Sequence, residues 1–335
     1  MSGGGIHSND FCGLINIDDL FIAWKAFRKG KRSKAEVAEF ELNLEENIFT
    51  LHDDLISGKL KLDPYIAFYV QDPKLRRIHK ASVRDRVLYQ AVYQKLYPLF
   101  DPSFIHDSYS SRDGKGTHRG VKRFEEFARK ATRNYSHNAF ALKCDIRKFF
   151  DSIDHAILLN LIRKKCKDHF LISLISKIIS SFEAASGKGL PLGNVTSQIF
   201  ANIYMNKLDQ FVKHTLMAKY YIRYCDDFVI IDESKEKLES YISRLSEFLK
   251  NDLSLELHPR KISIRKISQG IDFLGYVSLP YYRVLRTKTK RRMLKRICEK
   301  NLSSYLGMLT HCKSLQIRKA ILDPIFHSRT HHADH

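Results

Sequence analysis

The chain has 335 residues, of which 44% are hydrophobic, which allows a sizeable core in two or three subdomains and argues against global disorder. Lys and Arg number 57 against 37 for Asp and Glu, and the formal net charge of +20 favours a polyanionic partner, usually nucleic acid, over a basic surface that binds nothing. Scattered cysteines argue against a zinc site, and the lack of a signal peptide or a membrane-spanning apolar run predicts a cytoplasmic protein without membrane contact.

In the first half of the chain, the apolar pattern predicts helices with one β-hairpin between them. Apolar residues recur at helical spacing over 17–60, and two short strands with a turn between them follow. The expected elements, in order, are helices over 17–60, strands over 65–70 and 77–81, a helix over 83–97, a loop over 105–119 and a strand over 140–146.

The second half alternates helices with short strands. Two helical patterns precede a loop with three glycines, and Thr196 is a candidate cap for the helix that follows. The expected elements are helices over 155–166 and 170–182, a loop over 186–193, a helix from Thr196, a hairpin around 224–227, a helix over 234–249, strands near 253–257, 261–266 and 271–277, and basic helices from Tyr282. This order predicts an α+β sheet with helices on one face.

Two adjacent acids, Asp226 and Asp227, stand between apolar β-type stretches and are expected at a hairpin tip. The tip holds Cys225 where such turns favour glycine-containing pairs, and departures of this kind concentrate at functional sites. Asp145 ends the strand over 140–146, so three carboxylates meet if the two strands are neighbours. Carboxylates suit Mg²⁺, and two such ions can clamp an in-line phosphoryl transfer. The alternative is that the acids are solvated turn residues.

Five ordered sequence blocks resemble those of reverse transcriptases. The blocks cover 142–155, 189–198, 224–227, 257–261 and 273–276, and the third is a Tyr-x-Asp-Asp box. The similarity runs from about residue 65 to 309, and the chain resembles bacterial reverse transcriptases of the group II intron-like branch. The resemblance implies an α+β right-hand polymerase fold with fingers, a ferredoxin-like palm and a helical thumb.

Under this resemblance the chain divides into four parts. They are an N-terminal helical extension over 1–60, fingers over 61–138, a palm over 139–280 with finger insertions around 155–190, and a thumb with a C-terminal tail over 281–335. We find no pattern of an RNase H, DNA endonuclease or maturase extension. The resemblance therefore implies reliance on other factors for priming and integration, such as a small basic accessory protein.

The resemblance assigns the acids to metal binding and catalysis. Asp145, the backbone carbonyl of Ile146, and Asp226 would hold two Mg²⁺ ions, with Mn²⁺ as a substitute. Asp227 would lie nearer the primer end. Lys261 matches a lysine proposed to protonate the leaving pyrophosphate, and the alternative is one more surface lysine.

Further residues match the nucleotide pocket of the family. Phe150 falls on the aromatic position that blocks a ribose 2′-hydroxyl, with core packing as the alternative. Leu192 and Gly193 fall on the loop that lines the pocket, where glycine permits close approach, and Cys225 borders it. The basic side chains matched to the triphosphate are Lys74, Arg76 and Arg77. Arg77 is preferred because guanidinium binds phosphate bidentately, and a solvated run of charges is the alternative.

Other basic residues match contacts to nucleic acid. Arg112 falls in the Ser-Tyr-x-x-Arg loop of the family, which implies a template contact. The thumb would grip duplex backbone without sequence choice and in a salt-dependent way. Its expected contacts are Arg286, Lys288, Lys290, Arg291 and Arg292. A cationic solvent face is the alternative.

The sequence therefore predicts an RNA-directed DNA polymerase that uses an RNA template, a DNA primer and dNTPs. Gln198 replaces the Pro of many group II intron-like enzymes, and both Thr-Ser-Gln and residues 304–307 resemble diversity-generating retroelement polymerases. One alternative is a phage-defence reverse transcriptase that works with a non-coding RNA or without an ordinary template. Another is a catalytically idle RNA-binding scaffold, which has no need of three clustered acids.

Overall fold

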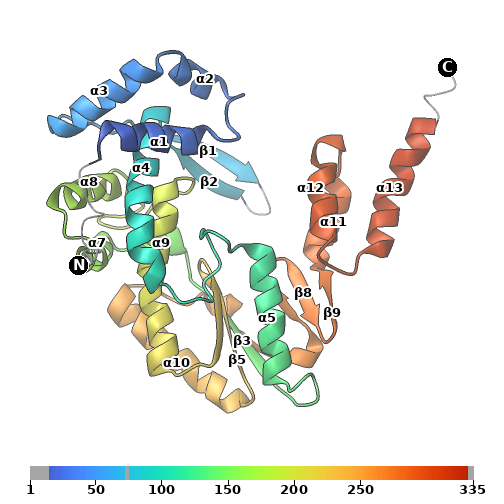
Figure 1. Cartoon of the computed structure of the whole chain (residues 1–335). Helices are drawn as coiled ribbons and strands as arrows, with labels where there is room; N and C mark the ends of the chain where they lie inside the picture. The colour runs from blue at the N-terminus through green and yellow to red at the C-terminus, as the bar shows by residue number, and fades with distance from the viewer. Residues whose placement is uncertain (1–14, 72–74, 331–335) are drawn as a thin grey trace, which may run out of the picture. The chain divides into compact units, whose positions relative to one another are not determined.

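The computed structural model describes residues 15–71 and 75–330 (Figure 1). The chain divides into two compact units, and successive segments of the sequence belong to them in alternation. Unit 1 comprises Met1–His106, Ile146–Phe211 and Ser246–Leu257, and unit 2 comprises Asp107–Asp145, Val212–Leu245 and His258–His335. Each unit therefore combines segments that are distant in the sequence. Within the described residues, no helix is long and apolar enough to cross a membrane.

Four helices of unit 1 form a cluster in which the first two contact the fourth and the third contacts the first two. They are α1 (Ile17–Arg28), α2 (Ala35–Leu42), α3 (Leu44–Ile56) and α4 (Val83–Phe100). α1 begins with a capping box, in which the Asn16 side chain accepts from the Asp19 N–H at 2.8 Å and the Asp19 carboxylate accepts from the Asn16 N–H at 3.1 Å. The buried ring of Trp24 lies 5.1 Å from that of Phe40, so α1 and α2 share a core.

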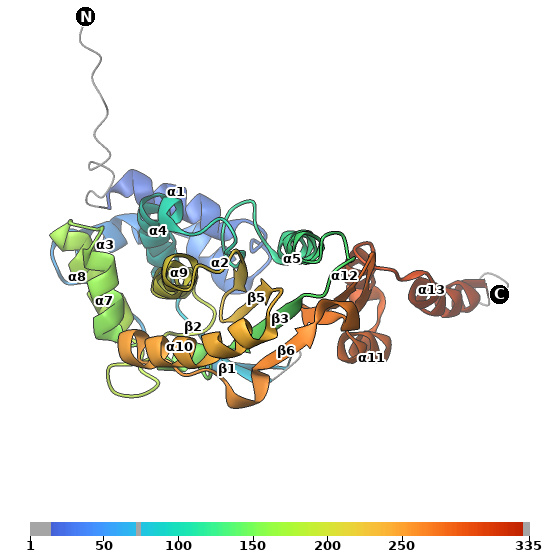
Figure 2. The ribbon, with the colours of Figure 1, turned by 90° about the horizontal axis from the view of Figure 1, so that it is seen from below.

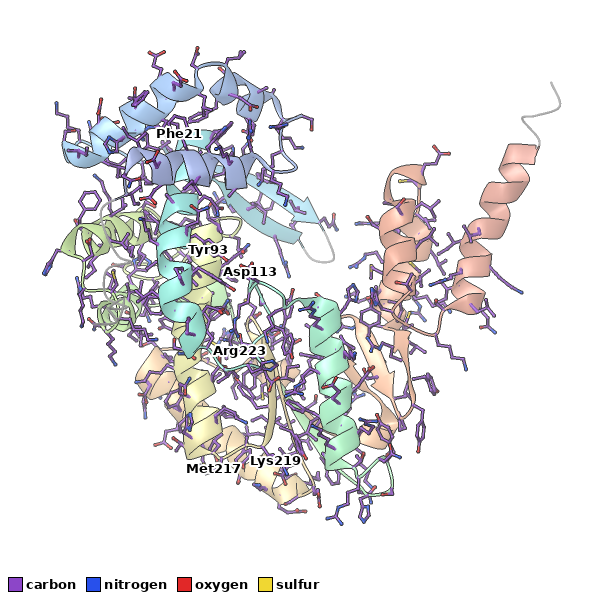
Figure 3. The ribbon with its side chains drawn as sticks, in the orientation of Figure 1. Phe21, Tyr93, Asp113, Met217, Lys219 and Arg223 are labelled. Carbon is purple, nitrogen blue, oxygen red and sulfur yellow. The ribbon has the colours of Figure 1, made fainter. Side chains whose placement is uncertain are left out.

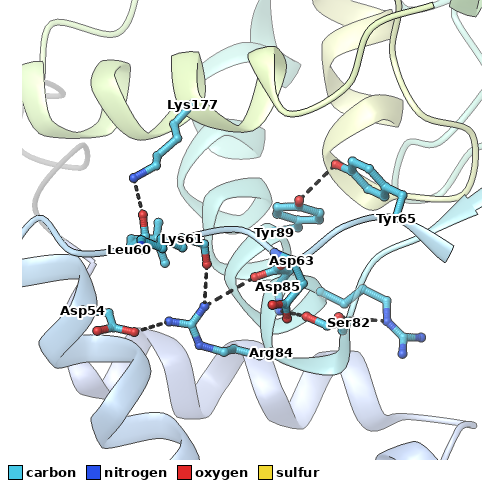
Figure 4. Close-up of polar contacts among 11 residues, drawn as sticks. Asp54, Leu60, Lys61, Asp63, Tyr65, Ser82, Arg84, Asp85, Tyr89 and Lys177 are labelled. Atoms are coloured by element: carbon cyan, nitrogen blue, oxygen red, sulfur yellow. Dashed lines mark hydrogen bonds and ion pairs between the residues drawn. The ribbon is translucent and has the colours of Figure 1, made fainter.

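A polar network ties the segment after α3 to its neighbours (Figure 4). The Asp85 carboxylate, at the start of α4, accepts from the Asp63 N–H at 2.8 Å. The Lys177 ammonium donates to the Leu60 carbonyl from a further helix, α8 (His169–Ser180). Asp85 is fully buried, so its hydrogen bond offsets part of the free-energy cost of burying a carboxyl group.

An antiparallel hairpin follows in unit 1. β1 (Ile66–Gln71) pairs with β2 (Leu75–Lys80), and residues 72–74 between them lie outside the described part of the chain. The second strand, expected over 77–81, begins at Leu75 because pairing continues to the end of β1. Both strands are largely exposed, so this hairpin has little core of its own and depends on its neighbours for stability.

The rest of unit 1 is mainly helical. Its elements are α6 (Phe149–Ser152), α7 (His155–Arg163), α8 and α9 (Val195–Gln210). Asp154 and Asp168 cap α7 and α8 by accepting backbone hydrogen bonds. α9 packs against α4 and α7 and is largely buried. Asn194 occupies its cap position, so Thr196, expected as the cap, lies instead in the first turn and is buried.

Unit 2 contains a four-stranded antiparallel sheet in the order β4-β5-β3-β6. The strands are β3 (Phe140–Asp145), β4 (Tyr220–Tyr224), β5 (Asp227–Asp232) and β6 (Ser263–Lys266), and α10 (Lys235–Leu253) connects the last two. The first strand in the chain, β3, is central and pairs with β5 on one side and β6 on the other. This is the strand order of a ferredoxin-like α+β sheet, as the resemblance to reverse transcriptases implies.

One face of this sheet is covered by α5 (Thr117–Ala131), a helix absent from the elements expected above. Phe124, Phe127 and Ala128 of α5 share a core cluster with Ile222 and Val229 of the sheet. Because the buried residues of α5 recur at helical spacing, the signal for this helix was present in the sequence. Residues that point to the opposite face, such as those at 142, 144, 228 and 230, are buried too.

The C-terminal part of unit 2 is a small sheet followed by helices. Its elements are β7 (Ile271–Phe273), β8 (Tyr276–Leu279), β9 (Tyr282–Leu285), α11 (Thr287–Arg296), α12 (Glu299–Leu309) and α13 (Leu315–Thr330). The three strands form an antiparallel meander in chain order. Leu285, Met293 and Leu309 belong to a core cluster that joins β9 to the helices.

Three expected elements in this region were wrong. No strand forms over 253–257, because Leu253 ends α10 and Leu257 makes only an isolated bridge with Ile146 in unit 1. The strand expected over 271–277 is divided into β7 and β8 by a turn at Leu274 and Gly275, which both have positive φ. The region from Tyr282 begins as strand β9 and becomes helical only afterwards.

Candidate functional site

Three acids meet at one edge of the four-stranded sheet of unit 2. Asp145, the last residue of β3, lies directly opposite Asp227, the first residue of β5. β3 and β5 run side by side in Figure 2. Tyr224 pairs with Asp227 across the β4–β5 hairpin, which leaves Cys225 and Asp226 as a two-residue turn. The pairing of strand ends that the sequence analysis required is therefore present.

The hairpin turn is strained at Cys225, whose φ is +58°. Positive φ at the first central position is typical of a type II′ turn, which normally takes glycine there. Burial raises the pKa of the Cys225 thiol to about 12, with a further contribution from the Asp226 carboxylate, so the side chain stays neutral. The fully buried Arg223, labelled in Figure 3, donates from its guanidinium to the Cys225 carbonyl at 3.0 Å and thereby fixes the turn.

Two lysines neutralise two of these acids. Lys143 Nζ lies 3.4 Å from Asp227 Oδ2 and donates to the Asp272 backbone carbonyl at 2.8 Å. The Lys261 ammonium donates to Asp145 Oδ1. Sequence reasoning named Lys261 but missed Lys143. The signal for Lys143 is its place two residues before Asp145, which puts both side chains on the same face of β3.

The chain around Lys261 is held close to β3. The short 3₁₀ turn Pro259–Lys261 begins after His258, whose imidazole Nδ1 accepts from the Arg260 N–H at 3.2 Å. The His258 N–H donates to the Asp145 carbonyl at 2.8 Å. The backbone of the fourth sequence block therefore pairs with the end of β3, which brings the Lys261 side chain to the acid.

Asp227 has the most perturbed environment of the three acids. Burial raises its pKa to about 6, and the Asp145 and Asp226 carboxylates add to the increase, while the ammonium group of Lys143 opposes it. Within the described residues, the buried Asp227 Oδ1 has no hydrogen-bond partner. A buried acceptor without a donor, beside other carboxylates, is suited to a cation.

The acids fit a divalent metal ion in part. Among the residues that the structure describes, no group of three or more His, Cys, Asp or Glu side chains stands close enough to form a ready-made metal site. The ammonium groups of Lys143 and Lys261 face two of the acids instead. The donor chemistry still suits Mg²⁺, which needs only one or two carboxylates when substrate phosphates and water supply the other ligands. The orphaned oxygen of Asp227 agrees with that fit.

In unit 1, a second set of predicted residues comes together against β2. The Leu190 N–H donates to the Phe150 carbonyl at 2.8 Å, and the His79 N–H donates to the Leu192 carbonyl at 3.0 Å. Gly193 has φ +115°, and a Cβ there would come within 3.0 Å of Ile78 Cγ2. The loop expected to line the nucleotide pocket is therefore docked on the hairpin, and only glycine permits this approach.

The two phenylalanines at the start of α6 differ in burial. Phe149 is buried, while Phe150 is half-buried with its ring 5.3 Å from that of Phe149. Phe149 thus serves the core and leaves Phe150 partly accessible, as a selecting side chain requires. Ile146, the expected backbone metal ligand, is buried in unit 1 and bridges Leu257. The roles of Phe150 and Ile146 stay predictions.

The basic residues matched to the triphosphate lie on β2. Arg76 and Arg77 are exposed there, opposite Val70 and Tyr69 of β1, and Lys74 lies outside the described residues. Sequence reasoning did not single out His79, which lies two residues after Arg77 on the same strand. Its ring lies 4.5 Å from that of Phe182, burial lowers its pKa, and its Nδ1 is buried without a hydrogen-bond partner among the described residues.

The residues matched to nucleic acid lie in varied settings. Arg112 donates to the Ser108 carbonyl at 3.2 Å within its own loop. Arg286 does not project freely, because its Nε donates to Asp272 Oδ1 at 2.7 Å. Lys288, Lys290 and Arg291 are exposed on α11, and Arg292 is half-buried. Their contacts to nucleic acid stay predictions.

Comparison with known proteins identifies one family that matches more than half of the chain. Residues 71–278 match the family model described as reverse transcriptase (RNA-dependent DNA polymerase). The chain is similar to Protein YkfC of Escherichia coli, with 23% identity over 304 residues that cover 78% of this chain and 77% of that protein. It is also similar to the group II intron-encoded protein LtrA of Lactococcus lactis, with 25% identity over 350 residues and 83% of this chain covered. The match spans only 56% of LtrA.

Solved structures show the same fold at low identity. Telomerase from Candida albicans, solved with a fragment of telomeric RNA, has a TM-score of 0.51 at 13% identity over 71% of this chain and 51% of that chain. Apo telomerase from Candida tropicalis has a TM-score of 0.50 at 14% identity over 72% of this chain and 60% of that chain. These likenesses concern the arrangement of helices and strands.

Proposed function

The chain belongs to the reverse transcriptase (RNA-dependent DNA polymerase) family, and from this membership we propose that it extends a DNA primer along an RNA template. The observation that carries the proposal is the meeting of Asp145, Asp226 and Asp227 at one end of two neighbouring strands. Carboxylates this close together repel one another, and bound cations would offset that repulsion beyond what Lys143 and Lys261 supply.

In this proposal Asp145 and Asp226 hold divalent ions, Mg²⁺ or in its place Mn²⁺, with the Ile146 carbonyl as a further ligand. Such ions supply Lewis-acid activation of a primer 3′-hydroxyl and charge neutralisation at the phosphate. The primer 3′-hydroxyl releases its proton to solvent water as its oxygen bonds to the α-phosphorus of a dNTP. The bond from that phosphorus to the oxygen that bridges the α- and β-phosphates breaks, and pyrophosphate leaves. Lys261 donates a proton from Nζ to that leaving group.

The residues of unit 1 receive the nucleotide. Arg76, Arg77 and Lys74 would neutralise the triphosphate, with Arg77 as the preferred bidentate donor. Phe150 would exclude a ribose 2′-hydroxyl, and Leu192 and Gly193 would line the pocket. The role proposed for Cys225, a residue of unit 2, rests on the sequence resemblance alone. Support comes from the docking of the Leu192 loop on β2, since the same strand carries the two arginines.

We also propose how the chain divides into the subdomains of a right-hand polymerase. The helices over 1–60 are an extension, 61–138 are fingers, 139–280 are palm with finger insertions around 155–190, and 281–335 are thumb. Arg112 would contact the template, and the basic helix α11 with Arg286 would grip the duplex backbone. The partners are accordingly an RNA template, a DNA primer or product, and dNTPs.

Within the family we assign the chain to diversity-generating retroelements, on the strength of Gln198 and residues 304–307. A template repeat beside a mutated near-copy in the genome would support this role. A neighbourhood of defence genes would favour the phage-defence role, with a non-coding RNA as partner. A small accessory protein fits either setting.

Primer extension on an RNA template with dNTPs and Mg²⁺ tests the activity. We expect the wild type to incorporate nucleotides and Asp226→Ala to lose incorporation. The matched control is Asp252→Ala, which removes an acid that pairs with Lys207 at 3.0 Å, where the two side chains are 40% and 39% exposed. Retained RNA binding without extension on several templates would instead favour the idle scaffold.

A further inference from the structure

Unit 2 contains a hollow of about 570 Å³ that none of the residues proposed for the polymerase reaction lines. Its wall comes from α5, from the loop after α5 and from the tip of the β8–β9 hairpin, and α5 lies beside β8 (Figure 1). The residues that matter here are Lys122, Arg129, Tyr135, Tyr281, Tyr282 and Arg283. The volume is that of an ordinary ligand pocket.

The wall is rich in aromatic side chains. The rings of Tyr135 and Tyr281 lie 5.0 Å apart in an edge-to-face arrangement. Tyr282 adds a third ring, with the Lys313 ammonium 5.4 Å from its centre. The residue Tyr281 is 80% exposed, a large fraction for so bulky an aromatic residue. Its face is therefore available to stack on a planar ligand.

Both tyrosines that face each other have a strained backbone. φ is +66° at Tyr135 and +71° at Tyr281, in the left-handed region that bulky residues avoid. Arg133 and Asn134, just before Tyr135, are left-handed as well. Tyr281 follows Pro280 in a two-residue turn, at a position where such turns normally use glycine. Strain of this kind concentrates at ligand sites, and here it holds two rings at one hollow.

The hollow also has a surplus of positive charge. Its two glutamates are already neutralised, because Glu125 pairs with Arg283 and Glu126 pairs with a neighbouring arginine of α5. Lys122 and Arg129 are exposed, and within the described ranges neither side chain has an ion-pair partner. These two cations project from one helix beside the aromatic wall and can take an anionic group.

We propose that this hollow binds one nucleotide unit of a nucleic-acid single strand, with the base stacked on Tyr281 and the phosphate held by Lys122 and Arg129. Aromatic faces beside a cationic groove are the recognition chemistry of single strands, tolerant of sequence and sensitive to salt. Single-stranded RNA and DNA share this chemistry. The proposal rests on the proposed function only in taking nucleic acid as the partner, and it adds a contact that the reaction at the acids does not require.

Photocrosslinking of the full chain without dNTPs gives a local readout. The probes are a short oligo(U) carrying 4-thiouridine and a short oligo(dT) carrying 4-thiothymidine, with crosslinked peptides identified by mass spectrometry. We expect crosslinks in the peptide that contains Tyr281 and Tyr282. Anisotropy with the same labelled oligonucleotides then measures affinity as a function of salt.

A pair of variants at one position separates stacking from folding. Tyr281→Gly removes the ring and suits the positive φ, so it does not strain the turn. We expect it to weaken binding about five- to ten-fold, while Tyr281→Phe retains the ring and binds as the wild type does. Arg129→Gln should flatten the salt dependence, by about 0.7 in the slope of log affinity against log salt. Lys130→Gln, an exposed neighbour outside the hollow, should leave the crosslink in place.

The proposal would be overturned if Tyr281→Gly and the wild type had equal affinity and equal crosslinking with both the RNA probe and the DNA probe. If Tyr281→Gly loses affinity for only one of the two probes, RNA or DNA, the result supports the proposal and identifies the sugar that the hollow prefers. Primer extension measured on the same preparations keeps the two proposals distinct. A wild type that crosslinks at Tyr281 but never extends a primer counts against the polymerase reaction alone.

Discussion

The Lys261 ammonium contacts the carboxylate of Asp145, across the turn that brings the fourth sequence block to the end of β3. An ammonium group and a divalent cation compete for the same oxygen. We therefore expect Lys261→Met to lower the Mg²⁺ concentration needed for half-maximal extension. If Nζ also protonates pyrophosphate, the same variant should lower kcat about 100-fold at saturating Mg²⁺.

Primer-extension rates measured across a Mg²⁺ titration separate these two effects. Arg260→Met is the matched control, because it removes the adjacent exposed cation and leaves Lys261 in place. An unchanged kcat for Lys261→Met would leave Lys261 as a counter-ion of Asp145 only.

Phe150 and Phe149 form a second matched pair. Phe150→Ala should reduce the preference for dNTPs over rNTPs by at least about tenfold in kcat/KM, because a half-buried ring that blocks a 2′-hydroxyl is removed. Phe149→Ala should instead lower the free energy of unfolding by about 3–5 kcal/mol, since that ring is buried. Single-nucleotide incorporation and denaturant unfolding measure the two outcomes. The selecting role is wrong if Phe150→Ala keeps full discrimination.

Gly189 is expected to be irreplaceable for steric reasons. Its φ is +113°, and a Cβ there would lie 2.8 Å from the backbone N and the Cβ of Ala184. Gly189→Ala should lower the free energy of unfolding by about 2–4 kcal/mol, from strain and from overpacking. Gly187→Ala is the control: φ is +68° but a Cβ meets nothing within 4 Å, so only about 1 kcal/mol should be lost. Equal losses in thermal or urea unfolding would rule out the clash.

Asp85 should make stability depend on pH between about 4 and 6. Burial raises its pKa from an ordinary 3.8 to about 6, and the Arg84 guanidinium, 3.6 Å away (Figure 4), opposes the increase. The folded chain therefore keeps a proton that the unfolded chain releases as the pH rises. The free energy of unfolding should fall over this window by up to about 3 kcal/mol, relative to Asp85→Asn, and stay level above it. Urea unfolding at several pH values measures this, and parallel curves for the two proteins would contradict it.

Much of the fold could be predicted because, in many of its elements, apolar residues recur at one regular spacing, that of a helix or that of a strand. β3 was expected over 140–146 and ends at Asp145, and α9 buries the apolar stripe read from the sequence. β7 and β8 could not be separated in this way, because Leu274 continues the apolar run while its positive φ turns the chain. That conformation belongs to the hairpin in which β7 pairs with β8, and a local apolar pattern does not show where such a hairpin turns. α5 was missed although its apolar spacing is regular.

The site was predictable where chemistry and strand ends coincide. Asp145 and Asp227 end and begin neighbouring strands, so an acid doublet and a distant acid were enough to expect their meeting. Lys143 and Arg223 were not expected, because a lysine or arginine inside a strand pattern usually points to solvent. Their roles depend on which strands become neighbours and on which loop closes over them, and both are properties of the assembled sheet.

The central place of β3 has a consequence for synthesis of the protein. β3 leaves the ribosome early, yet its two neighbours are β5 and β6, the latter ending at Lys266. Such long-range pairing is slow, and a nascent chain that ends after β5 already carries all three aspartates while one flank of β3 is bare. An unpaired strand edge invites association with other chains, so translation that pauses between β5 and β6 should yield aggregates or require a chaperone.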